Sequence, residues 1–106
     1  MRYLQLIWID ESTDEGPDPV EPWVEEMSGR GVRLQGSRLR PASDATTVRV
    51  RDGDVLLSDG PFAETKEQMG GYDLIECADL DEAIEIASKH PAARDGAIEL
   101  RPLWET

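Results

Sequence analysis

Residues 3–9 constrain the fold most strongly, because a strand here is apolar on both faces. In an extended strand one face carries Leu4, Leu6 and Trp8, and the other carries Tyr3, Ile7 and Ile9 with Gln5. A strand that is apolar on both faces is normally covered on both. The rest of the chain, or a second copy of it, must therefore supply two covering layers.

Only two substantial helices are predicted to provide such layers. The first spans residues 19–30, with Asp18 as N-cap, Glu21 completing a capping box, and an apolar stripe of Val20, Trp23, Val24 and Met27. The second begins after the N-cap Asp79, has Glu82 three residues later, and ends at His90-Pro91; its predicted stripe is Leu80, Ala83, Ile84 and Ala87.

Alternating and β-branched residues predict the remaining strands. These cover residues 32–39, 46–51, 55–58, 72–78 and 97–103, and Asp52-Gly53 is a tight hairpin turn between the second and third of them. In the polar segment 63–69, Thr65 is expected to cap a single helical turn that Gly70-Gly71 closes. In the last strand Ile98 and Leu100 are expected to point inward.

The order of these elements predicts one α+β domain over residues 1–106. Two β-α-β halves, joined by an extra β-hairpin, suggest a ferredoxin-like arrangement around an antiparallel sheet. Two helices cover only one face of such a sheet. We therefore expect a homodimer in which the uncovered sheet faces of two copies pack as a dimeric α+β barrel.

Composition argues against several classes of partner. Among 106 residues, 23 are acidic and 11 basic, and the net charge of −12 disfavours nucleic acid and anionic membranes. No apolar run reaches the roughly 18 residues of a membrane span. The first ten residues are interpreted as a strand, not a signal peptide, and the single Cys77 fits a reducing cytoplasm.

No familiar cofactor or metal motif is present, so no cofactor is expected. One histidine rules out a two-histidine metal face, and CxxC, Walker and GxSxG motifs are absent. His90 lies at the predicted end of the second helix, where a surface or capping role is more typical than catalysis. Cys77 is expected to be a small buried residue without a histidine to activate it.

The segment Asp59-Gly60-Pro61-Phe62 is the leading candidate site. Asp59 follows an apolar strand, Gly60 precedes a proline and favours extended or positive-φ geometry, and Phe62 should anchor the turn or line a cavity. A carboxylate on a rigid turn beside an aromatic ring suits a general acid or base. The competing interpretation is that Asp59 accepts local backbone hydrogen bonds and only shapes the turn.

Residues 57–72, Leu-Ser-Asp-Gly-Pro-Phe-Ala-Glu-Thr-Lys-Glu-Gln-Met-Gly-Gly-Tyr, closely resemble the signature of the DGPF-type branch of the YCII-related proteins. The similarity continues through residues 78–83, 91–93 and 98–102 and extends over nearly the whole chain. It implies a dimeric barrel of ferredoxin-like subunits, a small cleft in each subunit, and Asp59 as the polar residue of that cleft. Some relatives pair this aspartate with a histidine, and one branch removes chloride from a chlorinated hydroxyhydroquinone. His90 is not at the matching position.

Four further residues near the turn are candidate ligand contacts. Each also has a structural interpretation: Phe62 as an anchor, Thr65 as a helix cap, Lys66 as a solvated side chain or the partner of Glu64 or Glu67, and Tyr72 as a core residue with a satisfied hydroxyl. Trp8 and Trp23 are assigned to the core or to a dimer interface.

Three hypotheses for function remain open at the level of sequence. The first is a cofactor-independent lyase or isomerase acting on a small cyclic carbonyl or hydroxy compound, with Asp59 moving the proton. The second is a non-catalytic ligand-binding or regulatory module, which the resemblance associates with sigma-factor or stress systems. In the third, the turn is purely architectural.

Overall fold

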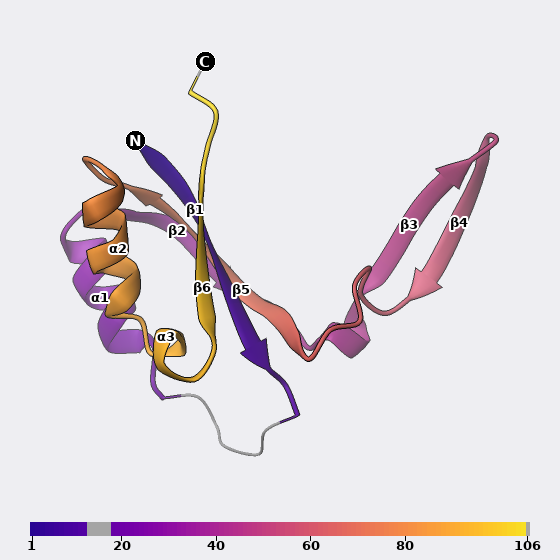
Figure 1. Cartoon of the computed structure of the whole chain (residues 1–106), viewed down its shortest axis with the longest axis horizontal. Coiled ribbons are helices and arrows are strands. Elements are labelled where there is room, and N and C mark those ends of the chain that lie inside the picture. The colour runs from indigo at the N-terminus through magenta and orange to yellow at the C-terminus, as the bar shows by residue number, and fades with distance from the viewer. Residues whose placement is uncertain (13–17, 106) are drawn as a thin grey trace.

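A computed structural model describes residues 1–12 and 18–105. Its main sheet has four antiparallel strands in the order β2-β5-β1-β6. These strands are β1 (Arg2–Asp10), β2 (Arg33–Arg38), β5 (Glu67–Glu76) and β6 (Ala97–Pro102). Each β-α-β half thus places its two strands around a strand of the other half (Figure 1). The α+β class expected from the sequence is confirmed, but this sheet does not close into a barrel within one chain.

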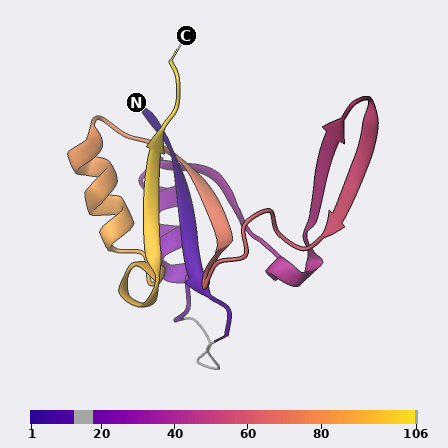
Figure 2. The same ribbon diagram turned by 45° about the vertical axis from the view of Figure 1, so that its right-hand side comes forward.

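Helices α1 (Glu21–Gly29) and α2 (Leu80–Ser88) lie on one side of the sheet (Figures 1 and 2). The short helix α3 (Ala92–Asp95) follows α2 and leads into β6. The core between helices and sheet contains Tyr3, Trp23, Met27, Ile75 and Ile86, each at most 4% exposed. The indole N–H of Trp23 donates to the backbone carbonyl of Ile86 at 3.0 Å and joins the two helices.

The other side of the sheet carries no helix in the described part of the chain. By strand register, Leu4 lies opposite Leu74, and Leu6 lies opposite Tyr72. These four side chains and that of Trp8 are half-buried. We call this surface the open face. The prediction that strand 1 is apolar on both faces is confirmed, and the helices among the described residues cover only one of them.

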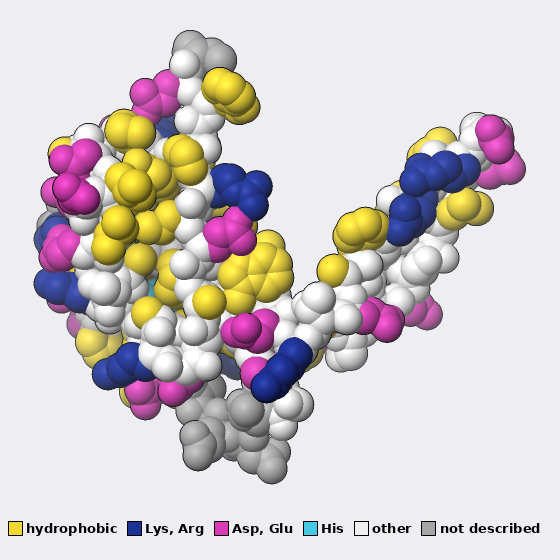
Figure 3. Space-filling model, viewed as in Figure 1, with side chains coloured by type: hydrophobic (Ala, Val, Ile, Leu, Met, Phe, Trp, Pro, Cys, Tyr) yellow, Lys and Arg dark blue, Asp and Glu magenta, His cyan; other side chains and the backbone are white. Residues whose placement is uncertain are grey.

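The hairpin of β3 (Thr46–Arg51) and β4 (Asp54–Asp59) forms a separate two-stranded sheet. We call residues 46–59 the arm. Its tip is the predicted Asp52-Gly53 turn, in which both residues have positive φ (51° and 81°), as a type I′ turn requires. Figure 3 shows the arm projecting away from the body, with hydrophobic side chains at its surface. The 3-10 turn η1 (Ala42–Asp44) lies at its base.

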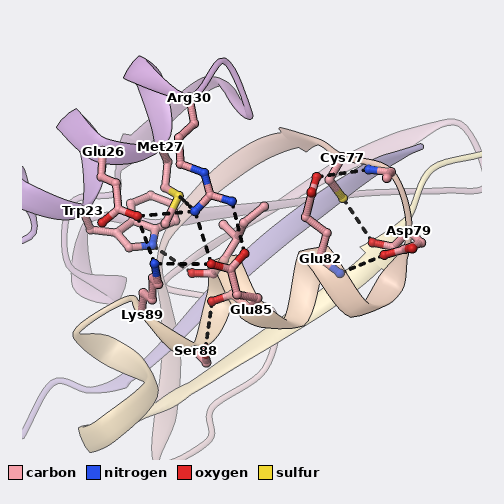
Figure 4. A network of polar contacts seen from close by, with 12 residues as sticks. Trp23, Glu26, Met27, Arg30, Cys77, Asp79, Glu82, Glu85, Ser88 and Lys89 are labelled. Carbon is pink, nitrogen blue, oxygen red and sulfur yellow. Dashed lines mark hydrogen bonds and ion pairs between the residues drawn. The ribbon is translucent and has the colours of Figure 1, made fainter.

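The two helices are joined at their outer surface by an ion-pair network (Figure 4). Both terminal nitrogens of Arg30 reach Glu85, at 3.3 and 3.1 Å, and Lys89 bridges Glu26 and Glu85 at 3.1 and 3.3 Å. These pairs are partly exposed, so each contributes at most about 1 kcal/mol. They orient two helices that the buried tryptophan already holds together.

Several predicted helix features are wrong. Helix α1 begins at Glu21 after Val20, without a side-chain cap, and Asp18 pairs instead with Arg94 at 2.9 Å. In α2, Leu80 and Ile84 are each 50% exposed, whereas Ala83, Ile86 and Ala87 are buried. The predicted N-cap Asp79 is confirmed, because its carboxylate accepts the N–H of Glu82 at 2.9 Å.

The segment before Tyr72 also differs from prediction. Strand β5 starts at Glu67, and Thr65 caps no helical turn; its hydroxyl donates to the carbonyl of Glu67. Gly70 and Gly71 lie within the strand and do not end a turn. A Cβ on Gly70 would approach the side chain of Ile9 to 2.5 Å, so a larger residue here would require that side chain to move.

Candidate functional site

The turn Asp59–Phe62 connects the arm to the body and is held by backbone contacts. The N–H of Gly60 donates to the carbonyl of Ala45 at 2.7 Å, and the hydroxyl of Thr47 donates to the carbonyl of Gly60 at 2.9 Å. Gly60 has φ +97°, which confirms the predicted positive-φ geometry. The next residue, Pro61, fixes the direction in which the chain leaves the arm.

Asp59 itself does not shape this turn. Its carboxylate is exposed and takes part in no hydrogen bond or ion pair within the described residues. The architectural hypothesis required Asp59 to accept local N–H groups, and the structure assigns that anchoring to Thr47 and to the backbone. The carboxylate is therefore available to a ligand or to another chain.

Phe62 is 75% exposed and lines no closed cavity. The guanidinium carbon of Arg49 lies 4.9 Å from the centre of its ring, a cation–π contact. The sequence pattern identified Arg49 only as a polar strand residue, because nothing local to β3 predicts that the turn brings Phe62 beside it.

The turn borders an open, shallow depression. Its lining contains a guanidinium, two hydroxyls, two carboxylates and an aromatic ring, contributed by Thr47, Arg49, Ser58, Asp59, Pro61, Phe62 and Glu64. Such a set can hydrogen-bond a small polar molecule and stack on its ring. Within one chain the depression is too open to exclude water.

The other predicted contacts lie outside this depression. The side chain of Lys66 is 84% exposed, in line with the solvated alternative, and its ion-pair partner at 3.9 Å is Asp10 instead of Glu64 or Glu67. Hydrogen bonds from the hydroxyl and the N–H of Ser12 hold the pKa of Asp10 below its ordinary value, and Lys66 adds a smaller effect. Thr65 precedes β5, and Tyr72 lies on the open face of the sheet. The structure thus brings Asp59 and Phe62 together, but not the five predicted residues.

A second polar cluster, which sequence reasoning missed, is buried between the sheet and the helices. The carboxylate of Asp73 accepts the amide N–H of Gln5 at 3.0 Å and the Nε–H of Arg33 at 2.8 Å. Asp73 is 4% exposed and Gln5 is fully buried, and Gln5 Oε1 has no partner among the described residues. Alternation in β1 and β5 could have indicated that Gln5 and Asp73 face inward.

His90 is buried, which corrects the expected surface position. It is 5% exposed and packs edge-on against Trp23, with ring centres 4.8 Å apart. Its Nδ1 accepts the N–H of Ala92 at 3.0 Å, so it caps the start of α3 and not the end of α2, where the capping role was predicted. Burial lowers the pKa of His90, and the negative charge of Asp73 partly opposes this effect.

Cys77 is buried, as expected, and burial raises the pKa of its thiol, which disfavours the nucleophilic thiolate. The described residues contain no group of three or more His, Cys, Asp or Glu side chains that could hold a metal ion. Over the same residues, no helix is long and apolar enough to cross a membrane.

Comparison with known proteins assigns the family. The sequence model of the YCII-related domain matches residues 1–106. The chain belongs to the YCII-related family. This YCII-related chain is also 48% identical over 69 residues to an uncharacterised protein, R00369, of Rhizobium meliloti (strain 1021). That match covers 63% of this chain and 56% of the other protein.

Proposed function

We propose that this YCII-related protein is a homodimeric small-ligand-binding module. The observation that carries the proposal is the open face, where Leu4, Leu6, Trp8, Tyr72 and Leu74 form an apolar surface that the described chain leaves uncovered. A contiguous apolar surface of this kind marks an interaction site. A second, identical face is the simplest cover, and it would enclose the space between two ferredoxin-like subunits as a dimeric barrel.

Binding is favoured over catalysis by the state of Asp59. A general acid or base needs a shielded environment and a partner that tunes its proton affinity. Asp59 is exposed, and His90 is buried beneath the helices on the other side of the sheet from the open face. The depression at the turn instead offers the guanidinium of Arg49 and the hydroxyls of Thr47 and Ser58, which suit recognition of a small hydroxylated or carbonyl compound.

The dimer is tested by a matched pair of substitutions. Leu74→Asp places a charge on the open face, and Leu80→Asp places the same charge on the exposed surface of α2. Light scattering after size exclusion should give a dimer for the native protein and for Leu80→Asp, and a monomer for Leu74→Asp. A native monomer at micromolar concentration, or a dimer that tolerates Leu74→Asp, would contradict the proposal.

Ligand binding is tested by thermal shift with cyclic hydroxy and carbonyl compounds. A ligand at a hundred times its dissociation constant should stabilise the protein by about 2.7 kcal/mol and be recovered unchanged by mass spectrometry. Arg49→Gln should weaken the shift by removing the guanidinium. A compound that is consumed instead of recovered would overturn the non-catalytic assignment.

A cofactor-independent lyase or isomerase remains the second candidate, and one observation favours it. The strand register places Asp59 opposite Thr46, on the same side of the arm as Val48 and Leu57. If a partner covered this apolar side, the carboxylate would lie in the shielded environment that a general base needs. Turnover that survives Asp59→Asn would exclude this role.

A further inference from the structure

The arm has one apolar and one polar face. Val48 lies opposite Leu57 in the ladder, and Val50 lies opposite Val55, so all four side chains point to the same side. They are 58–68% exposed. The other side carries Arg49, Leu56, Arg51, Asp54 and two hydroxyl residues. This alternation is typical of a hairpin with one buried face, yet nothing in the described chain buries it.

The arm also has no structural support from its own body. It pairs only with itself and stands apart in Figures 1 and 3. The radius of gyration is 15.7 Å, whereas a compact chain of this length has about 13 Å. An isolated two-stranded hairpin is at best marginally stable in water. Its order therefore implies a surface against which it packs.

The arm is not free to fold back onto its own open face. Its base is tied to the body at η1, where the N–H of Ala42 donates to the carboxylate of Glu11 at 3.2 Å, and Pro61 fixes the exit of the chain. Folding the arm back would move this base away from Glu11. The surface that covers the arm is therefore expected on another molecule.

A second copy of the chain can supply the surface that covers the arm. The chain has two uncovered apolar surfaces, the open face and the apolar side of the arm, and a two-fold axis can pair each with the other in one closed contact. Charge does not oppose this contact. Apart from Asp59, the apolar side of the arm is uncharged, and so are the open-face residues Leu4, Leu6, Trp8, Tyr72 and Leu74.

We infer that the arm is exchanged between two copies, so that its apolar side covers part of the open face of the partner. Asp59 is on the apolar side of the arm, so it then lies beside the open-face residues of the other copy, including Trp8 and Tyr72. Thr47, Arg49 and Ser58 are on the polar side and face outward, so the partner completes the ligand site at its Asp59 edge. This inference rests on the proposed dimer and specifies which element of the second copy completes the site.

Photocrosslinking tests the exchange directly. Leu57→p-benzoylphenylalanine places the reactive group on the apolar side of the arm, and Leu56→p-benzoylphenylalanine places it on the polar side one residue away. Irradiation of the full-length Leu57 variant should give a covalent dimer whose crosslinked peptide contains β1 or β5. The Leu56 variant should give little of it.

A charge at the same two positions gives an independent measurement. Leu57→Asp should raise the dimer dissociation constant at least tenfold in sedimentation equilibrium, and Leu56→Asp should leave it within twofold. Both side chains are already exposed in the single chain, at 68% and 47%, so neither change should unfold it.

The outcomes separate this inference from the proposed dimer. A native dimer without crosslinks from position 57 to β1 or β5 of a second copy, or one unaffected by Leu57→Asp, would overturn arm exchange and leave the dimer standing. A native monomer at micromolar concentration would overturn both.

Discussion

At the scale of single residues, the most constrained group is a carboxylate that the sequence did not single out. Two aspartates, Asp59 and Asp73, follow similar apolar patterns, yet the first is exposed and the second is 4% exposed with two charge-assisted or amide hydrogen bonds. Burial of an ionised group is tolerated only when it is paired. Asp73 therefore has a structural role, and Asp59 remains available for binding.

This difference predicts opposite effects of the same substitution. Asp73→Ala leaves the donors of Arg33 and Gln5 without their acceptor and should destabilise the protein by about 2–4 kcal/mol. Asp59→Ala should change stability by less than about 0.5 kcal/mol, as exposed substitutions do. Urea denaturation at neutral pH measures both. Equal losses of stability in the two variants would mean that the Arg33–Asp73 ion pair does not stabilise the pairing of β2 with β5.

His90 makes stability depend on pH. Because burial lowers its pKa in the folded chain below the value of about 6.5 expected when unfolded, the unfolded chain binds a proton first as pH falls. The stability contributed by neutral His90 is complete at pH values above the unfolded pKa of about 6.5, and it is lost progressively as the pH falls below that value.

The comparison variant for His90 is His90→Asn, which keeps an acceptor for the N–H of Ala92 but has no imidazole to protonate. Between about pH 7.5 and 5.5, the urea midpoint of the native protein should fall more than that of the variant. Parallel curves for the two proteins would show that His90 titrates as it does in the unfolded chain.

At the scale of elements, a glycine in β2 allows this strand to pack closely against β5 in the sheet. Gly36 lies opposite Asp73, and a Cβ there would approach Asp73 Oδ1 to 2.2 Å and the carbonyl oxygen of Tyr72 to 2.7 Å. The second contact is with backbone, which cannot move aside without shifting β5. The glycine leaves room for the Arg33–Asp73 pair.

Gly36→Ala should therefore destabilise the protein by about 1–3 kcal/mol, the usual cost of overpacking. The matched control is Gly29→Ala in the last turn of α1, where a Cβ meets nothing within 4 Å. It should be neutral or stabilise by up to about 1 kcal/mol, because alanine favours helix. Thermal unfolding of the two variants, followed by circular dichroism, distinguishes them; similar melting temperatures would refute the steric argument.

Elements were predicted well where one local pattern decided between alternatives. The two apolar faces of β1 and the Asp52-Gly53 turn each allow one interpretation, and both are confirmed. The predicted stripe of α2 was half right: Ala83 and Ala87 are buried, but Leu80 and Ile84 are each 50% exposed. Ile86, which the stripe left out, is buried because of tertiary packing near Trp23, whose indole N–H donates to the carbonyl of Ile86. Gly70-Gly71 was mistaken for a stop because sequence does not reveal the side chain of Ile9 against it.

The candidate site was predicted in part for the same reason. Local preferences identified the turn and the geometry of Gly60, but the exposure of Asp59 depends on how the arm projects from the body. No short segment encodes that angle; it results from contacts between residues 13 or more positions apart, such as Thr47 with Gly60.

At the scale of the whole molecule, the body and the arm differ in what stabilises them. The body has its own core between helices and sheet, whereas the arm has only its ladder of hydrogen bonds. Regions with few buried apolar contacts open locally at low free energy. The protection of the arm should therefore depend on association, and that of the body should not.

Hydrogen exchange at several protein concentrations measures this dependence. Dilution from a concentration where the dimer dominates to one where it dissociates should speed amide exchange in residues 46–59 at least tenfold. Exchange in α1 and in the central part of β5 should stay within about twofold, since the global stability of the body limits it. Concentration-independent exchange in the arm would mean that it is ordered without a partner.

The projecting hairpin also exposes strand edges that favour aggregation. Each of its two strands leaves one row of backbone N–H and C=O groups unpaired, and such rows are templates for intermolecular β-pairing and aggregation. Asp52, Asp54 and Asp59, together with the net charge of −12, oppose the approach of like ribbons. The acidic composition thus disfavours pairing between the exposed edges of two arms.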